Sequence, residues 1–340
     1  MKKITLILLL LTVIVGSCDF SPDGVGSANW EVNMFGPLAK TDMQMSDMLK
    51  LQKFEFAQSF TPAQFSLPTG TFQAFPPIPG LQIGPVDSPI KDQPFESVLL
   101  SSGNVKITIE NGFPINIKSG AVILIESGGN QIINHTIPQN INPSGGKYET
   151  SMDIANKTIG KSVKITISNA GSDGSSTPIT VSGQEKLTVS LKIENLIFTS
   201  MIINTINPII FASDTTPFNM RGEVIKTQLA SGVLNVYFVN QLPVSFKVQV
   251  NFMDESRINN LASAFADSVT IEAAGIEGER ERKYTINIDE NLIDVMNKAK
   301  YIKFDVTINT VNNQIVTIYP SNKIKMNLVA DIKLKVNQKQ

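Results

Sequence analysis

The chain has 340 residues, 17% of them charged, and a formal net charge of −1. This balance produces no strong attraction to nucleic acid, so we expect no nucleic-acid partner. A single cysteine and a single histidine exclude a disulfide framework and the usual zinc ligand sets, and we expect no cofactor.

The chain opens with a charged start, Met1-Lys2-Lys3, followed by an apolar run of residues 4–15. Small residues come next and lead into the only cysteine, in the order Val15-Gly16-Ser17-Cys18. Charge, short apolar core and small residues together are typical of an export signal. The run is too short to cross a bilayer, which takes about 20 residues. This length argues against an ordinary transmembrane anchor, and the other alternative is a secretory signal with an incidental cysteine.

Val-Gly-Ser-Cys resembles the lipobox of bacterial lipoproteins. The resemblance implies that residues 1–17 are a signal peptide, that cleavage falls between Ser17 and Cys18, and that Cys18 carries the lipid, with acyl chains such as palmitate. It places the protein on a membrane of the bacterial cell envelope, with the outer membrane as the expected location. Cys18 is then the first residue of the mature chain and is no free thiol.

Residues 18–30 are rich in glycine and poor in apolar residues, which favours a tether between lipid and fold. In residues 31–97 we expect short strands and then an extended proline-rich segment, because eight prolines lie between Pro62 and Pro94. Proline at that density prevents helix and central strand. The segment either lies on a folded surface through its phenylalanines or is a solvated linker.

From Val98 onward the chain alternates apolar and polar residues, and it contains an internal repeat. Residues 102–127 align without a gap on residues 231–256, and seven of the 26 pairs are identical. The shared features include a Ser-Gly opening and an Asn-x-x-Pro element at Asn111 and Asn240. Each copy predicts a strand with one buried face, a turn at the proline, and a second strand.

The ends of the two copies also match, because residues 179–191 resemble residues 316–328. The distance from the matching start to the matching end is about eight residues longer in the second copy than in the first, so the second copy contains about eight additional residues. We expect these residues to form a helix at 289–300, capped by Asp289. We expect further helix at 257–266.

The repeat predicts a mainly β fold with two tandem, Ig-like β-sandwich domains and minor helix. The expected boundaries are 98–211 for repeat 1, 212–228 for a connection and 229–340 for repeat 2. The alternative architecture is one continuous elongated body built from both halves, like the pseudo-symmetric lipid-binding tubes.

Little catalytic chemistry is visible in the sequence. His135 alternates with isoleucines on a predicted strand and is a surface or edge residue rather than a general base. The acidic candidates for glycoside hydrolysis or calcium binding are Asp173, Asp254-Glu255 and Asp289-Glu290. Each has a structural explanation in a turn, strand end or helix cap. We therefore expect no enzyme, no catalytic residues and no metal site.

The lipobox, the composition rich in asparagine, isoleucine and lysine, and the strand repeats together resemble the tandem-domain envelope lipoproteins of Bacteroidota-type bacteria. This resemblance implies a non-enzymatic, lipid-anchored protein that binds or scaffolds another envelope component, either a protein or a glycan. Two alternatives stay open: a carrier of lipid or another hydrophobic ligand with an elongated body, and a glycan-active enzyme.

Overall fold

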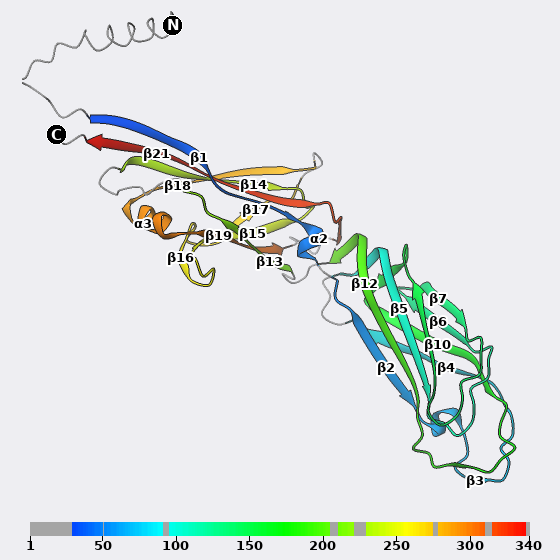
Figure 1. Cartoon of the computed structure of the whole chain (residues 1–340). Helices are drawn as coiled ribbons and strands as arrows, with labels where there is room; N and C mark the ends of the chain where they lie inside the picture. Colours follow the sequence, from blue (N-terminus) through cyan, green and yellow to red (C-terminus); the bar gives the residue numbers. More distant parts are fainter. Residues whose placement is uncertain are drawn as a thin grey trace, which may run out of the picture.

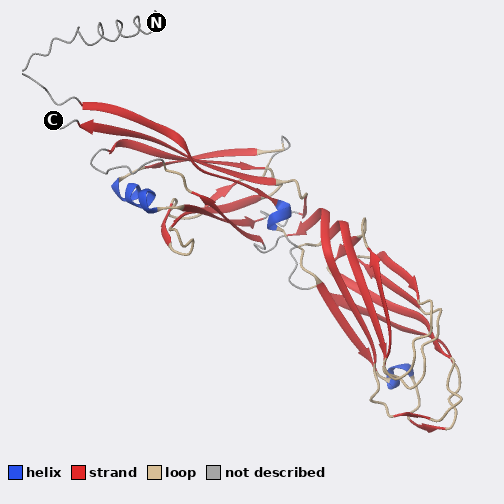
Figure 2. Cartoon of the chain, in the orientation of Figure 1, coloured by secondary structure: helices blue, strands red, loops and turns tan. Residues whose placement is uncertain are grey.

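The computed structural model describes residues 29–49, 51–90, 95–204, 210–220, 229–274, 278–309 and 315–337. The predicted signal peptide, the cleavage site at Ser17 and Cys18, and the tether up to residue 28 lie outside these residues. The described chain is almost entirely antiparallel strand and forms two elongated lobes placed end to end (Figures 1 and 2). The mainly β, tandem-sandwich fold predicted from the sequence is confirmed.

The lobe farther from the described ends of the chain, here called the distal lobe, contains a six-stranded and a four-stranded sheet. The strand orders are β2-β12-β5-β8, with β20 also paired to β12 and β9 to β5, and β4-β10-β6-β7. Its strands are β2 (Phe54–Phe60), β4 (Ile78–Pro89), β5 (Ser97–Asn111), β6 (Val122–Ser127), β7 (Asn130–Thr136), β8 (Gly146–Asp153), β10 (Ser162–Ser172) and β12 (Leu187–Asn204). Short elements complete it: the 3-10 helix η1 (Pro62–Phe65), β3 (Gly70–Phe72), β9 (Thr158–Gly160) and β11 (Ile179–Val181).

The proximal lobe repeats this architecture with strand orders β1-β21-β14-β18 and β13-β19-β15-β16. Its strands are β1 (Asn29–Gln44), β13 (Ile210–Pro217), β14 (Leu229–Asn240), β15 (Ser245–Met253), β16 (Asn260–Ser263), β18 (Arg280–Asn287), β19 (Tyr301–Asn309) and β21 (Lys323–Asn337). The remaining elements are α2 (Met45–Met48), β17 (Val269–Ile271), α3 (Glu290–Lys298) and β20 (Ile315–Ile318).

The two lobes have the same topology, and one is inserted into the other. In each lobe the first strand pairs with the last one: β2 with β12, and β1 with β21. The first strand of the proximal lobe nevertheless precedes the whole distal lobe in the sequence, and β13 follows it. The distal lobe therefore occupies the connection between the first and second strands of the proximal lobe, so the chain passes between the lobes twice.

Two buried asparagines anchor corresponding turns in the two lobes. Asn111 and Asn240 are both fully buried, at the ends of β5 and β14. Each side chain accepts a hydrogen bond from the main-chain N–H two residues ahead, at Phe113 and Leu242. Each also donates to the carbonyl four residues ahead, in both cases at 2.8 Å. The predicted Asn-x-x-Pro repeat is therefore a repeated hydrogen-bonded corner.

A strand from the proximal lobe joins the lobes directly. β20 pairs with the last four residues of β12, from Met201↔Ile318 to Asn204↔Ile315. β2 covers the other end of the same edge of β12, over Leu187–Ile193. Within the proximal lobe, α2 holds the connection between β20 and β21, because Met45 N–H donates to the Asn322 carbonyl at 2.9 Å.

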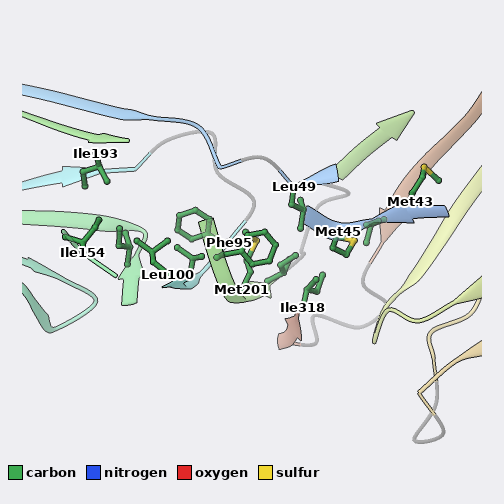
Figure 3. Close-up of a cluster of buried hydrophobic side chains, with 14 of the residues drawn as sticks. Met43, Met45, Leu49, Phe95, Leu100, Ile154, Ile193, Met201 and Ile318 are labelled. Atoms are coloured by element: carbon green, nitrogen blue, oxygen red, sulfur yellow. The ribbon is translucent and has the colours of Figure 1, made fainter. Parts of the chain in front are cut away.

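An apolar cluster fills the space around this junction (Figure 3). Met45, Leu100, Met201 and Ile318 are fully buried, and Phe95 retains 2% of its exposure. Burying each such side chain contributes about 1.5–3 kcal/mol. The double chain passage, the strand pairing and this cluster therefore couple the two lobes.

Several local expectations differ from the structure. Residues 31–97 divide between the lobes: β1 is one long strand of the proximal lobe, whereas β2, β3 and β4 belong to the distal lobe. The proline-rich part includes β4, which tolerates Pro79, Pro85 and Pro89 because it is an edge strand.

β13 comprises residues 210–217, so it includes the last two residues expected in repeat 1 and residues 212–217 of the expected connection, and it pairs with β19 along its whole length. The expected helix at 257–266 is wrong, because this segment is a turn followed by β16 paired with β15. The other expected helix is confirmed as α3, with Asp289 as its N-cap.

Candidate functional site

The two sheets of the distal lobe are open along one side, between the edge strands β2 and β4. A cleft of about 510 Å³ lies there, toward the end of the lobe that faces the junction. Its walls come from both sheets: Gln52, Lys53, Phe54, Glu55, Phe56, Ser88, Pro89, Ile90, Val163, Leu191 and Ile193. Clefts of this size are in the range of ligand sites. We call the gap between β2 and β4 the open seam.

Strand periodicity produces the apolar wall of the cleft. Phe54 and Phe56 alternate with exposed Lys53 and Glu55, so the rings face the gap between the sheets. Phe54 pairs with Ile193 and Phe56 with Leu191 on β12. The result is a continuous aromatic and aliphatic surface below a polar rim.

The open seam continues beyond the cleft as two small hollows. One, of about 10 Å³, lies between Phe60 and Ile83. The other, of about 30 Å³, is lined by Phe65, Leu67 and Leu81 among others. The apolar gap therefore follows the length of β2 and β4 from the junction to the far end of the lobe.

The rim of the cleft carries charges of both signs that neutralise one another. Lys53 Nζ lies 3.0 Å from Glu55 Oε1, and the hydrogen bond and charge of Lys53 lower the pKa of the Glu55 carboxyl. Beside Glu55, Lys192 on β12 donates a hydrogen bond to Glu194, which raises the pKa of the Lys192 ammonium group, but neither Lys192 nor Glu194 lines the cleft. Because the rim carries a basic side chain beside an acidic one, it does not select a strongly charged ligand.

The corresponding seam of the proximal lobe is closed. The Thr216 hydroxyl donates to the Lys40 carbonyl at 3.0 Å, and the Thr41 hydroxyl donates to the Asp214 carboxylate, which joins β13 to β1. Asn219 N–H donates to the Leu38 carbonyl at 2.8 Å. Among the described residues of β2 and β4, no hydrogen bond crosses the open seam. Two copies of one fold thus differ in whether this seam is sealed.

The residues that the sequence marked as candidates lie elsewhere and apart from one another. His135 is on the edge strand β7, half-buried, and hydrogen-bonded to the Tyr148 hydroxyl. Asp289 accepts from Leu292 N–H at 2.8 Å as a helix cap.

The other two acidic candidates sit in loops. Asp173 accepts from Asn116 and Lys118, and these bonds lower the pKa of its carboxyl, that of Asn116 most. Asp254 accepts from Ser256 and Asn259 within its own turn, which also lowers its pKa. Within the described ranges, no three histidine, cysteine, aspartate or glutamate side chains gather as a metal site would require.

Cys18 and Ser17 lie outside the described residues, and the structure does not bear on lipidation there. Among the residues that the structure does describe, no helix combines the length and apolar character that a bilayer crossing requires. The open seam was missed by sequence reasoning. Its only local signals in the sequence are Phe-x-Phe at 54–56 and the prolines of β4. These do not predict the seam, because the assembled sheets determine which two strands border a gap.

The fold and its open seam define a tandem β-sandwich protein with a cleft in one of its two copies. The sequence matches no protein-family model and no curated relative. Solved structures with weak likeness include a candidate secreted protein from Parabacteroides distasonis, with 11% identity over 96% of this chain and 94% of that chain and a TM-score of 0.28.

Tandem CBM22 modules of Paenibacillus barcinonensis Xyn10C align at 6% identity over 93% of this chain and 100% of that chain, with a TM-score of 0.18. Tandem CBM51 modules of Streptococcus pneumoniae Sp3GH98 align at 8% identity over 85% and 99%, with a TM-score of 0.21. These scores are low, and the likeness carries no argument about what this chain binds.

Proposed function

We propose that this chain is a non-enzymatic, lipid-anchored protein of the bacterial cell envelope that binds or scaffolds another envelope component. The arrangement of the lobes carries the proposal. β1 begins beside the end of β21, at Asn29↔Asn337, and this end of the proximal lobe lies far from the distal lobe (Figure 1). A lipid on Cys18 would therefore hold the proximal lobe near the membrane and present the distal lobe away from it.

The length of the tether sets the reach of this arrangement. Ten residues, 19–28, separate Cys18 from Asn29. A fully extended chain of that length spans at most about 35–40 Å. The open seam, which lies beyond the junction, would then face envelope components at a distance from the anchoring bilayer.

The experiment compares the native chain with Cys18→Ala in membrane fractions, and with Ser21→Ala in the tether as a matched control. The native chain and Ser21→Ala are expected in the membrane fraction, and intact mass should show a chain that starts at Cys18 with added acyl mass. Cys18→Ala should lose membrane association. Retention of Cys18→Ala in the membrane fraction would overturn the anchor.

The structural roles of the acidic candidates support the non-enzymatic part of the proposal. Asp173, Asp254 and Asp289 each accept local hydrogen bonds that stabilise turns or a helix start. Turnover of a glycan or peptide by the purified mature chain, abolished by one carboxylate substitution, would contradict it.

A second candidate, binding of a lipid or another hydrophobic ligand, is favoured by the cleft of about 510 Å³ with Phe54, Phe56 and Ile193 in its wall. A fluorescent fatty acid titrated into the mature chain tests this candidate. Saturable fluorescence enhancement that Ser88→Trp abolishes would support it, and no enhancement would exclude it.

A further inference from the structure

We propose that the open seam receives an extended peptide segment of a partner protein, which adds as a strand to the free edge of β2 with its apolar side chains in the cleft. This inference deepens the proposed function and rests on it for the location of the partner. It follows from the unpaired edges, the internal comparison between the lobes and the chemistry of the cleft.

The free edge of β2 provides the main-chain groups for strand addition. β2 pairs with β12 on one side and ends its sheet, so the groups that face the seam have no strand partner among the described residues. Such an edge is a template for another strand. β2 contains no proline and covers Phe54–Phe60, a length of about 23 Å. It can therefore pair with a segment of about seven residues.

β4, on the other side of the seam, is a poorer template. Pro79, Pro85 and Pro89 lack the N–H groups that a ladder requires. An incoming strand is therefore expected to pair with β2 and only to contact β4 through side chains. This asymmetry gives the site a defined receiving edge.

The chain itself uses edge pairing next to the proposed site. At the junction, β20 adds to the same edge of β12 that β2 borders. In the proximal lobe the equivalent seam is closed directly, because Thr216 on β13 and Asn219 just after it donate to carbonyls of β1. A strand segment of the chain thus already pairs next to the open seam.

The cleft suits a peptide better than an acyl chain. Gln52, Lys53, Glu55 and Ser88 line it together with the apolar residues. An acyl chain in the cleft would leave the main-chain groups on the free edge of β2 without a hydrogen-bond partner from the ligand, at a cost for each group that is desolvated. An extended peptide pairs with the edge and places every second side chain against Phe54 and Phe56.

A displayed library of random peptides of about 12 residues, selected on the intact mature chain, tests the inference. We expect enrichment of peptides with an apolar residue at every second position. Ser88→Trp fills the cleft without removing core atoms and should weaken binding of a selected peptide at least tenfold. Gln131→Trp is the matched control, because Gln131 is exposed on β7 at the opposite edge of the same sheet, and should leave binding unchanged.

Backbone recognition separates this site from a general apolar patch. Alternate N–H groups of a strand point to opposite edges, so the selected peptide can be N-methylated either at the N–H groups that face β2 or at those that face away from it. Methylation of the first set should reduce affinity at least tenfold, whereas methylation of the second set should not. Equal effects of the two methylation patterns on affinity, or selected peptides that bind Ser88→Trp as tightly as the native chain, would overturn the inference.

Two further outcomes would replace it. A fluorescent fatty acid that binds the native chain but not Ser88→Trp, without enrichment of alternating peptides, would make the seam a lipid site. A native dimer that Ser88→Trp dissociates would make the occupant a second copy. Failure of the lipid anchor alone leaves the peptide result intact, so the two proposals can be separated.

Discussion

Asn111 and Asn240, 129 residues apart in the sequence, make the same pair of hydrogen bonds within their own turns, as acceptor from the N–H two residues ahead and as donor to the carbonyl four residues ahead. Both side chains also donate to a carbonyl outside their own turn, at Asn142 in the segment before β8 and at Glu272 just after β17. The alternation and the Asn-x-x-Pro spacing thus correspond to one three-dimensional corner built twice.

This corner predicts a large stability loss in Asn240→Ala. The substitution leaves the Leu242 N–H and two carbonyls without their partner, and each buried unsatisfied group costs about 1–3 kcal/mol. We expect a loss of about 2–4 kcal/mol in the free energy of unfolding of the proximal lobe, measured by urea denaturation. The control Asn130→Ala changes an exposed side chain on β7 and should leave the midpoint unchanged. Equal midpoints for both variants would refute the role of the corner.

The pairing of β20 with β12 predicts that Val316→Pro loosens the lobes without unfolding them. Val316 pairs with Ile203, and proline cannot donate in the ladder. Spin labels placed on β7 and β18 should give a broader distance distribution in this variant, while circular dichroism keeps the strand signal. Val316→Thr, which retains the N–H group, is the control. An unchanged distribution in Val316→Pro would show that this pairing does not restrain the lobes.

The buried junction cluster predicts a stability effect at Met201. The Met201 side chain is fully buried beside Phe95 and Ile318 (Figure 3). Replacement by alanine leaves a cavity, and large-to-small changes of this kind cost about 2–5 kcal/mol. Met201→Leu conserves volume and should cost less than about 1.5 kcal/mol. Thermal unfolding of the two variants would contradict this prediction if Met201→Leu were as destabilised as Met201→Ala.

The Asp173 carboxylate predicts a local pH dependence. Hydrogen bonds from Asn116 and Lys118 lower its pKa below the ordinary value of 3.8. A lowered folded-state pKa means that the carboxylate contributes stability above the unfolded value and loses it as the pH falls through the folded pKa. Carboxyl NMR titration should place the Asp173 midpoint below 3.8 in the native chain and raise it in Asn116→Ala. A midpoint that Asn116→Ala does not move would contradict the assignment.

The N-cap of α3 predicts a rescue pattern at Asp289. Its carboxylate accepts the Leu292 N–H, and loss of such a cap costs about 1 kcal/mol. Asp289→Ala should therefore lower the unfolding midpoint, whereas Asp289→Ser should restore most of it. Similar losses in both variants would indicate that the carboxylate acts otherwise than as a cap.

The sequence predicted those parts of the fold that depend on neighbouring residues. Alternation over 105–109 and 234–238 correctly predicted strands with one buried face, and Asp289 correctly marked a helix start. It did not reveal the insertion of one lobe into the other, because the pairing of β1 with β21 joins segments almost 300 residues apart. No local pattern encodes such a partner.

Two of the local differences between prediction and structure have physical explanations. β4 contains prolines, which local reasoning assigns to extended coil, but an edge strand needs donors on only one side. The segment at 257–266 contains apolar residues that suit a helix, yet Asn260 and Ser263 hydrogen-bond to Asn251 on β15 and fix it as a hairpin strand. The open seam could not be predicted, since it exists only between two assembled sheets.

The insertion of the distal lobe also imposes an order on folding. β1 is synthesised first but cannot pair until β21, the last strand, has followed it, so the proximal lobe closes only when the whole chain is present. The distal lobe has all its strands within residues 54–204 and can form earlier. In the meantime β1 keeps an unpaired edge and an apolar face, a state that is prone to wrong association. Until β21 has been made, β1 therefore depends on the rest of the chain, or on another protein, to keep it from pairing elsewhere.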